Sequence, residues 1–249
     1  MSDSDPEETY VRGATLRFGD NLIFESISLD LVIGGWTCLL GQSGVGKSSL
    51  LRLIAGLEHN ATAIERKAAG ITDGTQNTAY MAQQDLLMPW LTLAENVSIG
   101  ARLRNEAKKG SLERACHLLD RVGLGDQAET YPDACSGGMR QRTALARTLF
   151  ENRQVVLMDE PFSSVDSITR LDLQDLASEI LFGKTVLLVT HDIQEALRLG
   201  DKVVVMKGRP ANLEIISQLP EGSTPRAVDD AGMAVAQAEI LRLIGGNSV

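Results

Sequence analysis

The sequence is poor in cysteine, in aromatic side chains and in positive charge. Its three cysteines, Cys38, Cys116 and Cys135, are an odd number, and no two stand at metal-ligand spacing, which favours free thiols in a reducing compartment. Lys and Arg total 24 against 33 for Asp and Glu, which gives a formal net charge of -9. Sequence-independent nucleic-acid binding needs a basic surface, so no nucleic-acid partner is expected.

A long apolar run is also lacking, since none approaches the roughly 20 residues that a membrane-spanning helix needs. Residues 1–9 are acidic and polar, without the basic start and apolar stretch of a secretory signal, and are expected to form a disordered tail. We therefore expect a cytosolic protein that reaches any membrane through a partner. The remainder, 10–249, is long enough for one large domain with a subdomain.

Two kinds of strand pattern occur along the chain. From Tyr10 to about Ile33, apolar and polar residues alternate, which predicts an N-terminal antiparallel β subdomain with one solvated face. Later apolar runs are continuous, as in parallel strands buried on both faces; they are 37–40, 155–158, 186–189 and 203–206. Helical patterns at 47–57 and 170–181 separate these runs. The alternation predicts an α/β core with a mainly parallel sheet.

A mostly helical stretch at about 85–150 interrupts that alternation and is expected to be an inserted α-helical subdomain. Thr92 and Glu95 have capping-box spacing. An amphipathic stripe, most simply interpreted as core, consists of Leu112, Ala115, Cys116, Leu119 and Val122. One more helix is expected near the C-terminus, at about 229–244.

A glycine-rich turn between the first continuous run and its helix has the form G-x-x-x-x-G-K-[ST]. Glycines let backbone N–H groups turn toward phosphates, and the helix start adds partial positive charge. Lys47 can reach the β- and γ-phosphates, and the Ser48 hydroxyl can ligate Mg²⁺. The residues expected to bind ATP here are Gly41, Gln42, Ser43, Gly44, Val45, Gly46, Lys47, Ser48 and Ser49. Such a loop predicts a P-loop NTPase, but it does not choose among kinases, GTPases, helicases and transport ATPases.

Two acids end the apolar run 155–158. Asp159 suits the Mg²⁺ shell of P-loop ATPases, and Glu160 can act as general base for an attacking water; the alternative is a structural salt bridge. His191 follows the strand expected at 185–190. Because parallel strands bring their carboxyl ends to one edge, where ligands bind, this histidine can bond a γ-phosphate and the water.

A second glycine-rich helix start lies at Ser136, Gly137 and Gly138. Serine is a good N-cap, and the glycines leave the backbone bare, so this too can bind an anion. Either it caps a helix and does nothing more, or it grips phosphate on another molecule. The residues alone do not decide between these two interpretations.

Over nearly its whole length the chain resembles the ATP-binding cassette (ABC) family. Residues 135–142, C-S-G-G-M-R-Q-R, are similar to the family signature L-S-G-G-x-x-Q, with Cys135 in place of the usual leucine. The resemblance implies one ABC ATPase domain, 10–249, and a head-to-tail pair of chains around two nucleotides. The residues that would close over the partner's ATP are Ser136, Gly137, Gly138 and Gln141.

Further roles follow from the same resemblance. Gln83 aligns with the glutamine of the Q-loop, which senses Mg²⁺ and touches the transmembrane subunit. Phe18 aligns with the aromatic residue that stacks on adenine, although a core aromatic is the alternative. Asp166 aligns with the D-loop across the dimer, and His191 with the switch histidine.

The resemblance also implies an importer, since exporters of this family commonly carry a fused membrane domain. Residues 87–92 and 208–210 resemble the importer group for nitrate, sulfonate or taurine, and thiamine precursors. The expected partners are a second ATPase subunit, taken to be a copy of this chain, separate transmembrane permease subunits and, through them, an extracytoplasmic substrate-binding protein. The chain would lie peripherally on the cytoplasmic face of the inner membrane. The cargo is expected to be a thiamine pyrimidine precursor or a sulfonate.

Other classes fit the residues less well. A soluble ABC ATPase of an assembly or repair complex remains the alternative, although repair members usually carry long coiled-coil or zinc-binding insertions. A GTPase should show N-K-x-D, which is missing. A small-molecule kinase has no need of 136–138, and a purely structural module has no need of Lys47, Asp159, Glu160 and His191 together.

Overall fold

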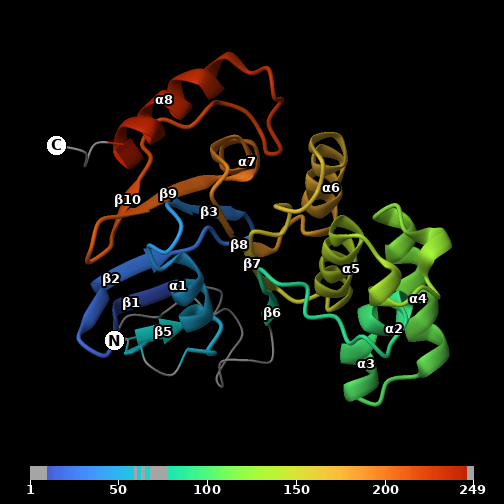
Figure 1. The fold of residues 1–249 in the computed structure, drawn as a ribbon. Helices are drawn as coiled ribbons and strands as arrows, with labels where there is room; N and C mark the ends of the chain where they lie inside the picture. Colours follow the sequence, from blue (N-terminus) through green and yellow to red (C-terminus); the bar gives the residue numbers. More distant parts are fainter. Residues whose placement is uncertain (1–9, 59–60, 63–64, 68–77, 246–249) are drawn as a thin grey trace. The chain divides into compact units, whose positions relative to one another are not determined.

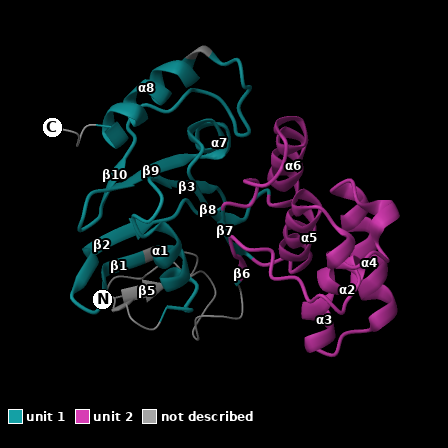
Figure 2. Cartoon of the chain, in the orientation of Figure 1, with its two compact units in different colours: residues 1–78, 154–159, 182–249 teal, residues 79–153, 160–181 magenta. Residues whose placement is uncertain are grey.

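The computed structural model describes residues 10–58, 61–62, 65–67 and 78–245 (Figure 1). The chain forms two compact units and passes between them four times (Figure 2). The first unit contains residues 1–78, 154–159 and 182–249, and the second contains 79–153 and 160–181. The predicted disordered tail, 1–9, lies outside the described residues. The predicted bounds of one domain at 10–249, with a helical part at about 85–150, stay predictions.

An antiparallel sheet forms the N-terminal part of the first unit. β1 (Tyr10–Phe18) and β2 (Asn21–Asp30) form a hairpin, and the short strands β4 (Ala61–Thr62) and β5 (Glu65–Lys67) pair with β1. Along β2 the apolar residues Ile27 and Leu29 are buried between exposed polar ones. The alternating pattern in the sequence is therefore a hairpin with one solvated face, as predicted.

The central sheet of the first unit lies between helices. The strands of this sheet that lie wholly within the first unit are β3 (Trp36–Gly41), β7 (Val155–Asp159), β8 (Thr185–Thr190), β9 (Lys202–Lys207) and β10 (Asn212–Ile215). They follow the order β10-β9-β3-β8-β7, in which only β10 is antiparallel to its neighbour. Every residue of β3, β7 and β8 is buried, which is why their sequences are continuous apolar runs.

Three helices cover this sheet. α1 (Lys47–Ile54) packs against β3, β7 and β8, and α7 (Ile193–Leu199) packs against β3 and β8. α8 (Ala231–Gly245), predicted at about 229–244, packs against α7 and β9. α1 ends three residues before its predicted end because Gly56 has a φ of 76°, the left-handed conformation that closes many helices.

The second unit is mainly helical. Its longer elements are α2 (Leu93–Val97), α3 (Ile99–Leu103), α4 (Lys108–Arg121), α5 (Gly137–Phe150) and α6 (Ser167–Ile180). Two 3₁₀ turns, Gly125–Gln127 and Pro132–Ala134, connect α4 to α5, and β6 (Thr78–Met81) lies at the boundary of the units. In the part of the chain that the structure describes, no helix has both the length and the apolar character to cross a membrane.

Local signals in this unit are confirmed. The Thr92 hydroxyl accepts a hydrogen bond from Glu95 N at 3.3 Å, and the Glu95 carboxylate accepts one from Thr92 N at 3.1 Å, so the capping box is present. Of the predicted stripe, Ala115, Leu119 and Val122 are buried, where α4 packs against α2 and α5. The core interpretation is confirmed for these three residues, whereas Leu112 and Cys116 are only half-buried.

Candidate nucleotide site

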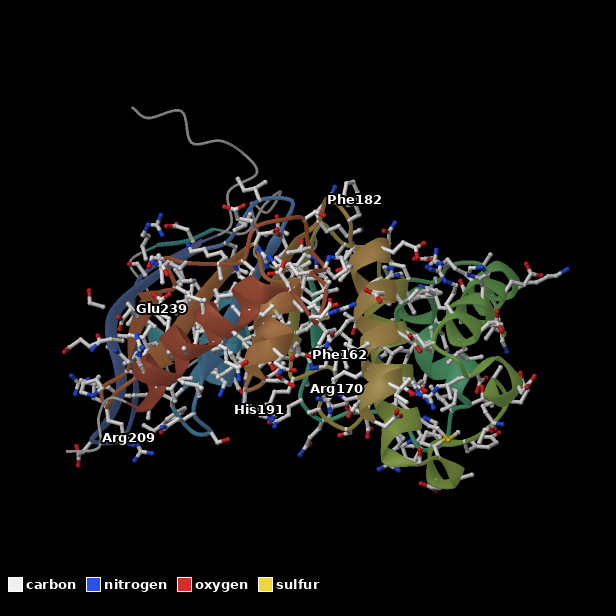
Figure 3. The ribbon with its side chains drawn as sticks, turned by 90° about the horizontal axis from the view of Figure 1, so that it is seen from above. Phe162, Arg170, Phe182, His191, Arg209 and Glu239 are labelled. Carbon is white, nitrogen blue, oxygen red and sulfur yellow. The ribbon has the colours of Figure 1, made fainter. Side chains whose placement is uncertain are left out.

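The carboxyl ends of three strands meet at one edge of the central sheet in the first unit. β3, β8 and β7 are parallel and in register, with Leu40 opposite Thr190 and Asp159 opposite Val189. Gly41, Asp159 and His191 stand at or just after these ends, so the fold gathers them at one edge. Asp159 is only 3% exposed, whereas His191, two residues before α7, is exposed (Figure 3).

The phosphate loop, residues 41–46, joins β3 to α1 and needs two of its three glycines for steric reasons. A Cβ on Gly41 would collide with the carbonyl oxygen of Met206. Gly46 has a φ of 117°, and a Cβ there would lie 2.8 Å from Ile23 Cγ2. Because Met206 belongs to β9 of the central sheet and Ile23 to β2 of the antiparallel sheet, the loop can run this close to both only with glycine at these two positions.

Lys47 is the first residue of α1 and is buried, with 5% of its surface exposed. Its Nζ donates hydrogen bonds to Gly41 O at 2.8 Å and to Gln42 O at 3.0 Å. The ammonium group is thus held by carbonyl groups of the loop itself. Phosphate oxygens can replace these neutral acceptors with charged ones, which make stronger hydrogen bonds.

The remaining predicted residues of the first unit lie close in sequence to the loop or to its neighbours. Ser48 and Ser49 are half-buried in the first turn of α1. Phe18 ends β1 at the hairpin turn and is 46% exposed, so it is not a core aromatic. The next strand, β2, carries Ile23 and Phe24, whose side chains would contact a Cβ on Gly46. An exposed ring at this turn can stack on a planar base.

In the second unit, three predicted residues are brought together around one turn. Gln83 Nε2 donates to a Glu160 carboxylate oxygen at 3.3 Å. The buried Gln141 side chain donates to the backbone oxygens of Glu160 at 3.2 Å and of Pro161 at 3.0 Å. Glu160 has a φ of 50°, a left-handed conformation that costs a non-glycine residue free energy. Such strain is typical of functional sites. Here the strained residue is Glu160, whose carboxylate accepts the hydrogen bond from the Gln83 side-chain amide.

The glycine-rich start of α5 also lies in the second unit. The Ser136 hydroxyl accepts a hydrogen bond from Met139 N at 3.2 Å and so caps α5. A Cβ on Gly138 would lie 3.3 Å from Ser164 O, whereas a Cβ on Gly137 would meet nothing within 4 Å. The structure therefore confirms that Ser136 caps α5. Binding of a phosphate on another molecule by this helix start stays a prediction.

Asp166, predicted for the D-loop, is the N-cap of α6. Its carboxylate accepts a hydrogen bond from Thr169 N at 3.1 Å, and this bond holds the pKa of Asp166 below its ordinary value. The carboxylate therefore has a structural task within the chain, and its predicted contact across a dimer stays a prediction.

The donors available in the first unit suit Mg²⁺. The predicted role of Gln83, which lies in the second unit, stays a prediction, whereas the Ser48 hydroxyl and the Asp159 carboxylate are hard oxygen ligands of the first unit. Among the described residues, no group of three or more His, Cys, Asp or Glu side chains could hold a metal by itself. Mg²⁺ is commonly bound by one or two carboxylates together with substrate phosphates, so these residues fit an ion bound together with a nucleotide.

Two polar anchors were missed by sequence reasoning. Asp85, two residues after the predicted Gln83, binds Arg140 and also accepts a hydrogen bond from Arg147 in the second unit. Arg226 lies in a segment without any recognisable motif or periodic pattern. It is buried and donates hydrogen bonds to the carbonyl oxygens of Pro220, Leu197 and Gly200. It thereby closes the C-terminal end of α7, the helix that follows His191.

A phosphate loop between a parallel strand and a helix, beside a strand that ends in Asp and Glu, defines a P-loop ATPase. A family profile described as ABC transporter matches residues 24–163, more than half of the chain. The chain belongs to the ABC transporter family as an ATP-binding subunit, and it is an ATPase.

Similar proteins agree with this assignment. An uncharacterized ABC transporter ATP-binding protein of Haemophilus influenzae is 40% identical over 95% of this chain and 98% of its own length. Aliphatic sulfonates import ATP-binding protein SsuB 1 of Pseudomonas syringae pv. syringae is 41% identical over 90% of each chain. Among solved structures, the dimeric post-hydrolysis state of the ATP-binding cassette MJ0796, bound to ADP and Pi, has a TM-score of 0.72. It is 26% identical and covers 88% of this chain and 99% of its own, which confirms the predicted fold class.

Proposed function

We propose that this chain is the ATP-hydrolysing subunit of an importer and works as a pair of copies against separate membrane subunits. It would lie peripherally on the cytoplasmic face of the inner membrane. The observation that carries the proposal is the gathering of the phosphate loop, Asp159 and His191 at one sheet edge. This occurs in a chain that is 41% identical to a protein named for sulfonate import.

The first unit binds the nucleotide in this proposal. Backbone N–H groups of the phosphate loop and the Lys47 ammonium hold the β- and γ-phosphates, and Phe18 stacks on the adenine. Ser48 and Asp159 hold Mg²⁺, which neutralises charge on the phosphates. His191 donates a hydrogen bond to the γ-phosphate from the end of β8.

The second unit supplies the base and the signature. Glu160, held by the Gln83 amide, accepts the proton of the attacking water as general base. Ser136 and the two glycines after it close over the nucleotide of the partner copy. Gln141, also predicted to touch nucleotide, has its amide committed to the Glu160 and Pro161 carbonyls. We assign it to holding the Glu160 turn.

A surface of the second unit suits contact with a membrane subunit. α2, α3 and α4 are grouped there (Figure 1) and surround a cavity of about 520 Å³. Polar and charged groups line it, among them Glu95, Arg102, Lys108 and Ser111. Nearby in sequence, Trp90 and Leu103 are 70% and 77% exposed, although large apolar side chains are usually buried. We propose that a cytoplasmic segment of the permease occupies this surface.

The proposed cargo is an aliphatic sulfonate. Several relatives of 35–41% identity that match 90% or more of this chain are named for sulfonate import. An ATPase subunit does not contact the cargo, so this proposal depends on kinship and not on a cargo site in this chain.

Nucleotide-driven pairing and hydrolysis are tested by Glu160→Gln. Removing a general base typically lowers turnover about 10²- to 10⁴-fold, and the neutral side chain should trap the closed pair. We expect light scattering to show dimers of this variant with ATP and Mg²⁺, monomers with ADP, and monomers when EDTA removes Mg²⁺. Glu113→Gln, an exposed glutamate on α4, is the matched control and should keep wild-type turnover. Monomers with ATP even in the presence of the membrane subunits would contradict the proposal.

The importer is tested by tagging the chain and identifying what co-purifies from detergent-solubilised membranes of its host. A multi-helix membrane subunit together with an extracytoplasmic binding protein would support import, and the ligand of the binding protein would identify the cargo. Soluble partners alone would favour an assembly or repair complex and overturn the importer. A bound ligand without a sulfonate group would overturn the cargo only.

A further inference from the structure

Residues 85–91 of the second unit, here called the 85–91 loop, present apolar side chains to solvent. Leu86 is 55% exposed and Trp90 is 70% exposed, whereas Leu87 and Leu91 are buried beneath them. An exposed tryptophan on an otherwise anchored loop is typical of an energetic hot spot for a partner protein. The loop is thus suited to contact a partner protein through Leu86 and Trp90.

The loop is held as one body by Asn96 of α2, which is fully buried. Its Oδ1 accepts a hydrogen bond from Met88 N at 2.7 Å, and its Nδ2 donates to Met88 O at 3.1 Å and to Leu91 O at 3.0 Å. At the start of the loop, Leu87 N donates to a carboxylate oxygen of Asp85 at 3.1 Å. Hydrogen bonds thus anchor the loop to Asn96 at Met88 and Leu91 and to Asp85 at Leu87.

Two arginines of α5 bind the start of this loop. Arg147 donates to the backbone oxygens of Asp85 and Leu86. Arg140 donates through Nε to the second Asp85 carboxylate oxygen at 3.1 Å and through Nη1 to Cys135 O at 2.9 Å. Because the guanidinium group is planar and rigid, a change of direction at Asp85 turns the Cys135 bond as well. Cys135 directly precedes Ser136, the cap of α5.

We propose that Asp85 and Arg140 form a relay that couples the position of Trp90 to the position of Ser136. The relay goes beyond the proposed function and rests on it, since that function provides the permease at Trp90 and the partner nucleotide at Ser136. Coupling between two sites acts in both directions. Closure of the ATP-bound pair on Ser136 should therefore change the surroundings of Trp90 even when no membrane subunit is present.

This reverse direction permits a test on the full chain alone. The chain has two tryptophans, and Trp36→Phe leaves Trp90 as the only one. In a Trp36→Phe, Glu160→Gln parent, we expect ATP with Mg²⁺ to shift the iodide quenching of Trp90 relative to ADP. Asp85→Asn keeps an oxygen for Leu87 N but loses the ion pair with Arg140, and it should lose the shift. Dimer formation, followed by light scattering in the same samples, should remain.

Arg140→Gln is the second variant, in case Asp85→Asn does not fold, and it should also lose the shift. The matched control is Arg142→Gln: Arg142 is on the same helix and also binds backbone oxygens, those of Val122 and Gly123, but not Asp85. It should keep the shift, which a merely structural role for α5 arginines does not predict. Asp133→Asn, an exposed aspartate before the signature, should keep it too.

A shift that persists in both Asp85→Asn and Arg140→Gln would overturn the relay, and so would a parent that dimerises with ATP without any shift at Trp90. A parent that stays monomeric with ATP would remove the proposed closure itself and the relay with it. Light scattering distinguishes that failure of the proposed function from a failure of the relay alone.

Discussion

Two helices of this chain begin with glycine-rich segments, and the two beginnings are built differently. α1 starts after Gly46, which has a φ of 117° and provides no side-chain cap. α5 starts after Ser136, whose hydroxyl caps the helix. Added Cβ atoms on Gly41 and Gly46 would meet residues of the same chain, whereas one on Gly137 would meet nothing within 4 Å.

The different space around these glycines indicates two different reasons for glycine at the two helix starts. At Gly41 and Gly46 the chain's own packing leaves no room for a Cβ, so the fold alone explains these two glycines. At the start of α5 the fold of the single chain has room for a side chain at Gly137. If Gly137 is required, the requirement must come from another molecule that approaches this helix start, and this can be tested by substitution.

The largest effect is expected from Gly46→Ala. A non-glycine residue at this φ costs about 1–3 kcal/mol in strain, and the overlap with Ile23 adds about 1–3 kcal/mol, so the free energy of unfolding should fall by about 2–6 kcal/mol. Urea unfolding measures this. Gly44→Ala is the control, since Gly44 has a φ of 77° but open space around it, and it should cost about 1 kcal/mol. Equal losses in the two variants would mean that packing against β2 does not explain Gly46.

The reverse pattern is expected for Gly137→Ala. Alanine is favoured over glycine in helices by up to about 1 kcal/mol, so the stability of the folded chain should stay equal or rise. ATP turnover should fall about 100-fold, which corresponds to about 2.7 kcal/mol in the transition state, because the added methyl group obstructs the partner's phosphates. Turnover and urea unfolding are measured on the same preparation. Unchanged turnover would show that nothing approaches Gly137 closely.

Substitutions of Ser136 can separate its capping of α5 from its proposed contact with the partner's phosphate. Ser136→Ala should lower the free energy of unfolding by about 1 kcal/mol, because the Met139 N–H loses its acceptor. Ser136→Asp keeps a good cap and should keep that stability, yet its negative charge should repel a phosphate and prevent ATP-driven dimers of the Glu160→Gln variant. Dimers that still form with Ser136→Asp would indicate that capping is the only task of this residue.

The same contrast explains what the sequence could and could not predict. Burial on both faces leaves a continuous apolar run, so β7 and β8 were found to within one residue at each end. The predicted end of α1, at Leu57, is three residues too late. Leu57 keeps the helical spacing, but Gly56 ends the helix before it. The Asp85–Arg140 pair joins residues 55 positions apart, and no local pattern marks such a contact. Arg226 was missed for the same reason, since two of its three acceptors, the Leu197 and Gly200 oxygens, are 29 and 26 positions away.

The smallest effect is expected from Cys135→Leu, which introduces the residue usual in the family at the first signature position. Cys135 is 7% exposed, its thiol donates to Tyr131 O at 3.3 Å, and burial raises the pKa of the thiol. Leucine loses a weak hydrogen bond and adds volume, so stability should change by about 1 kcal/mol at most. Turnover should stay within about twofold, less than about 0.5 kcal/mol, because the Arg140 bond to this residue uses its backbone oxygen and not its side chain. A tenfold loss of turnover would show that the size of this side chain sets the position of Ser136. The start of α5 would then be determined by packing within the chain, as the start of α1 is.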